Sequence, residues 1–342
     1  MNKDNNKSIF INASNCHQGG GKTLLDSFIS GIENSNNNYY IYIDSRYNPA
    51  KKSSINIKFI RITVWERLFI SYRIKKYAIN DDLVIYFGNL PPMLKFNKIK
   101  VILLLSNRFY VDKISFKGFS FRDMIKIKLE KLYFNLFKSN VNEFIVQTTT
   151  MKNLLQQNIK NSKVILTLPF ENSFINNDFT VEKEPNTFIY VASLLPYKNH
   201  KRLIQAWINL NKEGVSPKLF LTIDQNNEIE NWIKFNIIKY NLNVILLERI
   251  SRSELMNIYR KCEFLIYPSY FEAYGLPLVE ASNHNLKLLT ADIDYCWDLV
   301  TPNDFFNPYD VSSIERCVKR AIKVYDKKTN ILKPKDFINK II

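Results

Sequence analysis

Cysteine and histidine are scarce in this chain of 342 residues, and that scarcity narrows the chemistry available to it. The four cysteines are Cys16, Cys262, Cys296 and Cys317. They form no Cys-x-x-Cys pair and have no histidine cluster beside them, which argues against a structural zinc site or a disulfide framework. A reducing cytoplasm is the simplest compartment to expect.

Long apolar stretches are also missing. No apolar run reaches the ~20 residues that a membrane-spanning helix needs. The polar N-terminus, residues 1–15, lacks the apolar centre of a signal peptide. Any membrane contact is therefore expected to be peripheral.

The chain does have hydrophobic mass and positive charge. Hydrophobic residues make up 46% of it, enough to fill a substantial core and to exclude a disordered or fibrous chain. Lys and Arg number 48 against 32 Asp and Glu, a formal charge of +16. Such a surface attracts polyanions, phosphorylated ligands or an anionic membrane leaflet, and the composition does not choose among them.

Apolar strand patterns alternate with helical patterns in both halves of the chain. The expected strands are 8–13, 39–43, 57–60, 83–87, 101–105 and 144–146, then 187–192, 218–223, 244–247, 264–267 and 287–290. This alternation is typical of parallel α/β sheets. It predicts two doubly wound, Rossmann-like domains, 1–170 and 187–325, with a linker at 171–186 and a helical tail at 326–342. Ligands of such domains bind at the carboxyl ends of the strands, here in the cleft between the two domains.

The most informative segment is 264–280, a buried strand followed by a loop and a helix. Pro277 suits a first helical turn, and Gly275 lets the backbone approach a ligand closely. The free amides of that turn make an anion site that fits a diphosphate. Glu272 lies in the loop and Glu280 about one turn inside the helix, so both carboxylates can accept hydrogen bonds from sugar hydroxyls.

In spacing and flanking residues this segment resembles the E-x7-E signature of retaining nucleotide-sugar glycosyltransferases with GT-B architecture. The resemblance implies a nucleotide-diphosphate sugar donor and no cofactor or metal ion. It places Glu272 at the donor hexose and Glu280 at the nucleotide ribose, with the intervening loop at the donor. The loop residues concerned are Ala273, Tyr274, Gly275 and Leu276. The alternative interpretation is a strand and a helix that carry two incidental carboxylates.

Segment 188–206 is similar to the first strand, loop and helix of the same family's donor domain. The matching lysine, Lys198, neutralises the donor diphosphate as charge grows on the leaving group. A solvated loop lysine is the alternative. The family often has an arginine where Ser193 stands, so Arg202 or a residue of the N-terminal domain would have to supply the second positive charge.

The glycine-rich stretch Gly19-Gly20-Gly21-Lys22-Thr23 follows the first strand. A phosphate-binding Walker loop needs glycine where Cys16 stands, which excludes a nucleoside triphosphatase. In GT-B enzymes a glycine-rich loop here lies over the cleft near the donor phosphate and the acceptor. Gly19, Gly20 and Gly21 are therefore expected to line the cleft, and a plain tight turn is the alternative.

An imidazole base would have to be one of three histidines. These are His17, His200 and His284. His17, in the glycine loop, is best placed for the role. Where the family often carries a histidine after an N-domain strand, this chain has Asn107 and Arg108, which are expected to contact donor or acceptor or, alternatively, to cap the strand end. Retaining transfer can use the leaving phosphate as the base.

Carboxylate pairs that bind metal ions are not predicted. Asp81-Asp82 precedes a strand, and Asp292 and Asp294 belong to a loop expected near the nucleotide. Neither arrangement places an Asp-x-Asp pair after a central strand, so no metal site is expected.

Residues 122–138 form a basic helix with an apolar stripe of Ile125, Leu129, Leu132 and Leu136. The helix can lie on an anionic bilayer. Alternatively, the stripe packs on the sheet and the lysines face solvent. Lipid-linked acceptors are common in the family, which keeps the membrane interpretation open.

Taken together, the chain resembles bacterial enzymes that build O-antigen or other surface polysaccharides at the cytoplasmic face of the inner membrane. The resemblance implies a polyprenyl-diphosphate-linked glycan acceptor. A nicotinamide oxidoreductase is disfavoured because the spacing of a G-x-G-x-x-G loop is absent. A nucleic-acid binder is disfavoured because its motifs are absent. A catalytically silent GT-B homologue stays open because of Ser193 and the missing histidine.

Overall fold

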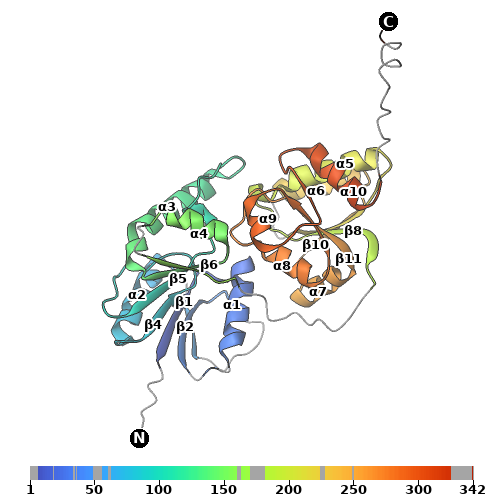
Figure 1. Ribbon diagram of the computed structural model, residues 1–342. Helices are drawn as coiled ribbons and strands as arrows, with labels where there is room; N and C mark the ends of the chain where they lie inside the picture. The colour runs from blue at the N-terminus through green and yellow to red at the C-terminus, as the bar shows by residue number, and fades with distance from the viewer. Residues whose placement is uncertain are drawn as a thin grey trace.

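The computed structural model describes residues 7–17, 19–33, 35, 37–48, 56–60, 63–159, 163–169, 182–223, 228–248, 250–324 and 341. These residues form two α/β units, each a parallel sheet with helices packed against it (Figure 1). The predicted fold class is confirmed.

The N-terminal unit contains a seven-stranded sheet in the order β3-β2-β1-β4-β5-β6-β7. Its strands are β1 (Ser8–Ala13), β2 (Asn38–Asp44), β3 (Asn56–Ile60), β4 (Leu83–Tyr86), β5 (Lys100–Leu104), β6 (Glu143–Val146) and β7 (Val164–Thr167). Its helices are α1 (Gly19–Ile32), α2 (Val64–Tyr77), α3 (Phe121–Phe137) and α4 (Thr149–Gln156), with 3-10 turns η1 (Arg108–Tyr110) and η2 (Lys138–Asn140). The strand order reverses between β1 and β4, the position at which open α/β sheets bind ligands.

The C-terminal unit contains a six-stranded sheet in the order β10-β9-β8-β11-β12-β13. Its strands are β8 (Glu184–Tyr190), β9 (Lys218–Ile223), β10 (Val244–Glu248), β11 (Cys262–Tyr267), β12 (Lys287–Ala291) and β13 (Asp304–Phe306). Its helices are α5 (His200–Lys212), α6 (Glu228–Lys239), α7 (Arg252–Lys261), α8 (Leu276–Asn283), α9 (Asp294–Leu299) and α10 (Val311–Ala321), with the 3-10 turn η3 (Pro196–Lys198). The order reverses between β8 and β11, where the donor segments were predicted.

Two edge strands, β7 and β13, were not predicted. They span four and three residues, too short for a periodic pattern to distinguish them from loop.

β8 begins at Glu184, inside the segment expected to be a linker. Residues 171–181 of that segment, and the expected tail apart from Ile341, lie outside the described residues.

The stripe on α3 does not pack on the sheet. Phe134 is fully buried, whereas Ile125, Leu129, Leu132 and Leu136 are 40%, 60%, 55% and 63% exposed. The helix therefore packs through the face that carries Phe134 and presents the stripe outward. The interpretation in which the stripe covers the sheet is wrong.

The two units meet at the loop before α8. Tyr274 of that loop and Leu276, the first residue of α8, belong to a buried apolar cluster with Cys16, Leu24 and Phe87 of the N-terminal unit. Burial of this shared cluster holds the predicted donor loop against α1 and the carboxyl ends of β1 and β4.

Candidate functional site

The loop between β11 and α8 has the backbone geometry that its glycine requires. Gly275 caps α8 with a positive φ of 78°, a conformation that other residues adopt only with strain. A Cβ atom there would lie 3.1 Å from Leu278 Cδ1. No side chain caps the helix, and Pro277 occupies its first turn, so the first-turn amides face the loop without a side-chain partner.

Glu272, in this loop, is held by a cation and a phenol. Its Oε1 atom accepts hydrogen bonds from Lys198 Nζ and, at 3.0 Å, from the Tyr267 hydroxyl. The Lys198 side chain is only 12% exposed, so it is not a solvated loop lysine. The structure brings together the two residues predicted to act on the sugar and the diphosphate.

Glu280 is buried inside α8, with 1% exposure. Its Oε1 atom binds the Arg252 guanidinium, and its Oε2 atom accepts from the Tyr259 hydroxyl at 3.3 Å. Burial raises the pKa of Glu280, and these two partners act in the opposite direction. A carboxylate so buried needs its cation, because an unpaired buried charge is costly.

Arg252 was not singled out in the sequence. It is the first residue of α7, after the Ser251 N-cap that forms a capping box with Glu254. Its Nε atom is buried and has no hydrogen-bond partner among the described residues. One basic residue in a helical first turn carries no distinctive signal, and only the fold places it beside Glu280.

Ser193 lies in the loop after β8, with its carbonyl accepting from the Leu195 amide at 2.8 Å. Arg202, suggested as a substitute for the missing arginine, donates to the Tyr270 hydroxyl and lies over the Tyr270 ring. The Arg202 guanidinium thus already has a protein partner.

The glycine-rich stretch is a helix start rather than a loop. Gly19, Gly20 and Gly21 form the first turn of α1, and Gly19 has φ of 61°. No described atom lies within 4 Å of a Cβ built on Gly19 or Gly20. Packing against the described residues does not require glycine at Gly20, and the predicted role of this turn in the cleft stays a prediction.

His17 precedes that turn and faces a carboxylate. Its Nδ1 atom lies 3.1 Å from Asp44 Oδ2, and Arg46 binds the same carboxylate at 2.7 Å. Burial of Asp44 opposes ionisation, but the hydrogen bonds and charge of Arg46, with the charge of His17, hold the pKa of Asp44 below its usual value.

The other two histidines are buried in the C-terminal unit. Burial, aided by the charge of Lys198, lowers the pKa of His200 to about 3. The Nδ1 atom of His284 lies 2.8 Å from the Glu280 carbonyl oxygen. His17 is therefore the histidine nearest the glycine turn, and its role as a base stays a prediction.

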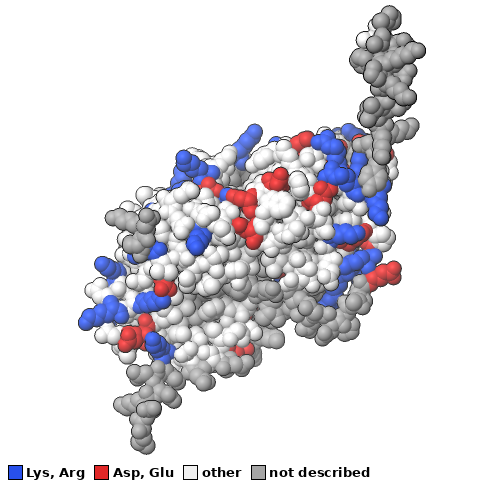
Figure 2. All heavy atoms as spheres, viewed as in Figure 1, with Lys and Arg blue, Asp and Glu red and all other residues white. Residues whose placement is uncertain are grey.

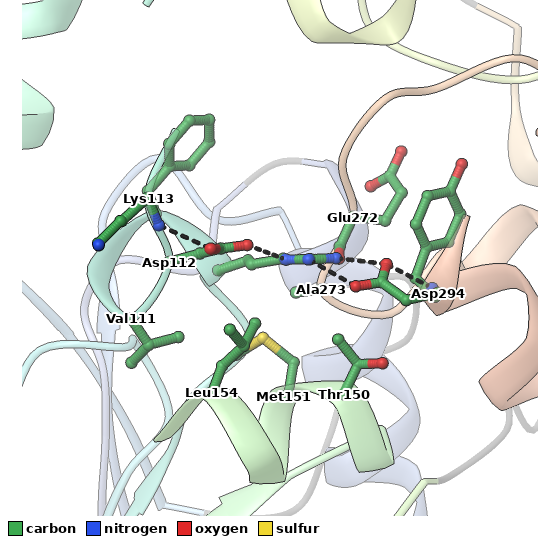
Figure 3. A network of polar contacts seen from close by, with 12 residues as sticks. Val111, Asp112, Lys113, Thr150, Met151, Leu154, Glu272, Ala273 and Asp294 are labelled. Atoms are coloured by element: carbon green, nitrogen blue, oxygen red, sulfur yellow. Dashed lines mark hydrogen bonds and ion pairs between the residues drawn. The ribbon is translucent and has the colours of Figure 1, made fainter. Parts of the chain in front are cut away.

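Arg108 joins the two units. Its Nε atom donates to Asp112 at 2.8 Å, and its two terminal nitrogens donate to the Asp294 carboxylate at 2.8 and 2.7 Å. One of them also reaches the Glu272 carbonyl oxygen at 3.3 Å. Figure 3 shows Asp112 and Asp294 on either side of the guanidinium, above α4. Arg108, predicted to contact a ligand, is occupied in this structure by protein partners.

Other residues near Arg108 also lie at the boundary between the two units. Asn107 caps the 3-10 turn η1 by accepting from the Phe109 amide at 3.0 Å, whereas the sequence left open a cap of the strand end. Asp294, expected in a loop, begins α9. The Thr148 hydroxyl donates to the Ala273 carbonyl at 3.2 Å, a second link from the N-terminal unit to the donor loop.

Gln147, at the end of β6, was also not predicted. It is 2% exposed, and neither its Oε1 nor its Nε2 atom has a hydrogen-bond partner among the described residues. Buried amides are normally paired, so this one is an exception that calls for an explanation. A glutamine after a strand does not by itself indicate a function. Only the folded structure shows that the amide of Gln147 is buried and without a partner among the described residues.

Two features are absent from the described residues. No group of three or more His, Cys, Asp and Glu side chains there is placed to hold a metal ion. No helix among them combines the length and the apolar character needed to cross a membrane.

Residues 172–336 match the family model described as Glycosyl transferases group 1. The O-antigen chain mannosyltransferase RfbU of Salmonella typhimurium is 25% identical over 205 residues, which cover 53% of this chain and 57% of that protein. The chain thus spans a little over half the length of this curated relative.

Solved structures resemble the whole fold. Sucrose-phosphate synthase of Thermosynechococcus elongatus has a TM-score of 0.67 at 13% identity, covering 93% of this chain and 90% of that one. Anabaena HepE in complex with UDP and glucose has a TM-score of 0.65 at 11% identity, with the same two coverages. At these identities the likeness shows the fold, which is the GT-B architecture.

Proposed function

Because its C-terminal half carries a glycosyl transferases group 1 domain, we propose that this chain transfers a sugar from a nucleotide-diphosphate sugar to a glycan acceptor during synthesis of a surface polysaccharide such as O-antigen. The observation that carries the proposal is the pairing of Lys198 with Glu272 beside an uncapped helix start, with Glu280 buried in the same helix. The O-antigen relative and the UDP and glucose in HepE agree with it.

The Lys198 and Glu272 pair is arranged for exchange of partners. Without donor, each neutralises the other. When a diphosphate arrives, Lys198 and the amides near Leu276 bind it, and Glu272 becomes free to accept hydrogen bonds from the sugar. The lysine then stabilises the charge that grows on the leaving diphosphate.

Glu280 and Arg252 are assigned to the nucleoside part of the donor. Glu280 accepts hydrogen bonds from the ribose hydroxyls, as the family resemblance implies. Arg252 contacts Glu280 and keeps an unpaired Nε donor, so it supplies the second positive charge that Ser193 cannot. The unpaired amide of Gln147 is assigned to a sugar hydroxyl.

The transfer itself retains the anomeric configuration in this proposal. The acceptor hydroxyl oxygen bonds to the anomeric carbon on the face that the diphosphate leaves, the bond from that carbon to the phosphate oxygen breaks, and the hydroxyl proton passes to the departing phosphate. No cofactor or metal ion enters this scheme. Contact of the two units around Arg108 excludes water from the reacting atoms.

A polyprenyl-diphosphate-linked acceptor at an anionic membrane surface completes the proposal. The outward stripe on α3 is flanked by the basic residues Arg122, Lys126 and Lys128, all exposed. A helix with apolar and basic exposed residues binds anionic interfaces. Figure 2 shows Lys and Arg side chains toward the outer edges of both units, and acidic side chains near the centre over α9.

The test is thermal-shift binding of UDP, GDP, TDP and ADP to wild type, Glu280→Gln and Glu263→Gln. Glu263 is the matched control because it too pairs with a cation, Lys287, but lies at the opposite end of β11. A nucleotide at 100 times its Kd stabilises by about 2.7 kcal/mol. Stabilisation of wild type and Glu263→Gln, lost in Glu280→Gln, supports the donor site and names the base. Stabilisation by none of the four points to a catalytically silent homologue.

A further inference from the structure

A cavity of about 440 Å³ lies in the N-terminal unit, away from the donor residues. Its wall combines Tyr86 of β4 with Leu90, Pro91 and Met93 of the following segment and Leu129 and Tyr133 of α3. The volume falls within the ~300–1,000 Å³ typical of small-molecule sites. The function proposed above does not use this space.

The polar groups around the cavity mostly satisfy one another. The Tyr133 hydroxyl donates to the Pro91 carbonyl at 3.1 Å, and the hydroxyls of Ser71 and Tyr86 share a hydrogen bond of 2.7 Å. Glu130 accepts from the Tyr110 hydroxyl at 3.0 Å. With these groups paired, the wall offers mainly apolar contact, which suits a hydrocarbon better than a sugar or a nucleotide.

One polar atom of the wall differs. Asn15 donates through Nδ2 to the Gly88 carbonyl at 3.1 Å, but its buried Oδ1 atom has no hydrogen-bond partner among the described residues. Asn15 and Gly88 lie just after β1 and β4, at the carboxyl edge that faces the reaction. The cavity therefore has a buried hydrogen-bond acceptor without a partner among the described residues, at the end next to the predicted cleft.

The opposite end reaches the surface of α3. Leu129 lines the cavity and is 60% exposed, and it belongs to the outward stripe that also contains Leu132 and Leu136. The lining of the cavity thus includes both Leu129 of the exposed stripe and Asn15 at the carboxyl edge of the sheet. Lys126 and Lys128, exposed on the same helix, complement the charge of an anionic lipid surface.

We propose that this cavity binds part of the isoprenoid chain of the lipid-linked acceptor, an assignment that rests on the proposed glycosyl transfer. The chain enters from the stripe on α3, and its polar end emerges beside Asn15, whose Oδ1 atom accepts a hydrogen bond from an acceptor hydroxyl. The cavity thereby places the acceptor glycan between the first turn of α1 and the donor loop.

The test measures binding of farnesyl diphosphate to the full chain by calorimetry without detergent, with inorganic diphosphate and dodecylphosphocholine as comparison ligands. Met93→Trp fills the cavity, and Leu129→Asp places a charge at its outer end. The control, Leu168→Asp, introduces the same charge at a leucine that is 49% exposed and does not line the cavity. Nucleotide stabilisation of each variant checks that it is folded.

We expect farnesyl diphosphate to bind wild type and Leu168→Asp equally, and its Kd to rise at least tenfold in Met93→Trp and Leu129→Asp. The assignment is overturned if farnesyl diphosphate binds no better than inorganic diphosphate, if dodecylphosphocholine binds as well, or if neither cavity variant weakens binding. Selective farnesyl diphosphate binding by a wild-type protein that no nucleotide stabilises would refute the glycosyl transfer and leave the isoprenoid site standing.

Discussion

The two units differ in the kind of residues that they place at their common boundary. In the C-terminal unit, Glu272 and Glu280 are each matched to a cation before any ligand is bound. In the N-terminal unit the corresponding edge carries a glycine turn and an apolar cavity. In the proposed function, the C-terminal half exchanges these charges with a diphosphate, and the N-terminal half holds a ligand by shape and apolar contact.

The loop at Glu272 depends on contacts from both units. The donor loop is fixed partly from the N-terminal unit, through Arg108 at the Glu272 carbonyl and Thr148 at the Ala273 carbonyl. The backbone at Glu272 is thus positioned partly by contacts that the N-terminal unit supplies. The comparison between the two units is sharpened by substitutions that remove either a charged group assigned to the donor or a contact that positions the loop, but not both.

The largest effect is expected from removing the lysine of the charged half. Lys198→Ala deletes the group assigned to the leaving diphosphate, so kcat should fall on the order of 10²- to 10³-fold, as when one stabilising donor is lost. Steady-state kinetics of sugar transfer measures it. Lys218→Ala is the control, because Lys218 pairs with Glu184 at the far end of the same sheet. Equal kcat in wild type and Lys198→Ala would contradict the assignment.

A smaller effect is expected at the junction. A double-mutant cycle with Arg108→Ala and Asp294→Ala should give a coupling energy of about 2 kcal/mol in unfolding, because the Arg108 side chain is only 9% exposed. Solvent at the partly exposed Asp294 limits the value. The KM for the donor should rise in both single variants, because the loop at Glu272 loosens when the ion pair is lost.

The matched cycle uses Arg320 and Asp304, which also form two hydrogen bonds but with the arginine 46% exposed. Its coupling should stay below about 1 kcal/mol, with an unchanged KM. If both cycles give the same coupling energy, the Arg108–Asp294 ion pair is no stronger than a surface pair. The contact between the units then does not position the loop at Glu272.

The smallest effect is expected at Gln147, where stability and activity should move in opposite directions. Gln147→Leu removes a buried, unpaired amide, so the free energy of unfolding should increase by about 1 kcal/mol. At the same time, kcat/KM should fall about tenfold because a sugar hydroxyl loses its partner. Urea unfolding and kinetics test the pair of outcomes, with the exposed Gln157→Leu as control. Loss of stability in Gln147→Leu would show that the amide has a structural role.

Much of the fold could be predicted because its signals are local. The strands β1 and β9 were predicted with their observed bounds, and the short β7 and β13 were missed because a few residues carry no period. The α3 helix shows the limit of periodicity. Its stripe was visible in the sequence, but the depth at which Phe134 packs decided which side faces outward.

The sequence by itself determined the segment predicted to bind the donor, since Glu272, Gly275 and Glu280 lie within nine residues whose loop and helix geometry is set locally. Only the tertiary structure decided what these groups contact. Arg252 is 28 residues from Glu280, and Arg108 is 186 residues from Asp294. Partners so distant are chosen by the packing of whole elements. The burial of a charged side chain and the identity of its partner depend on that packing rather than on any pattern along the chain.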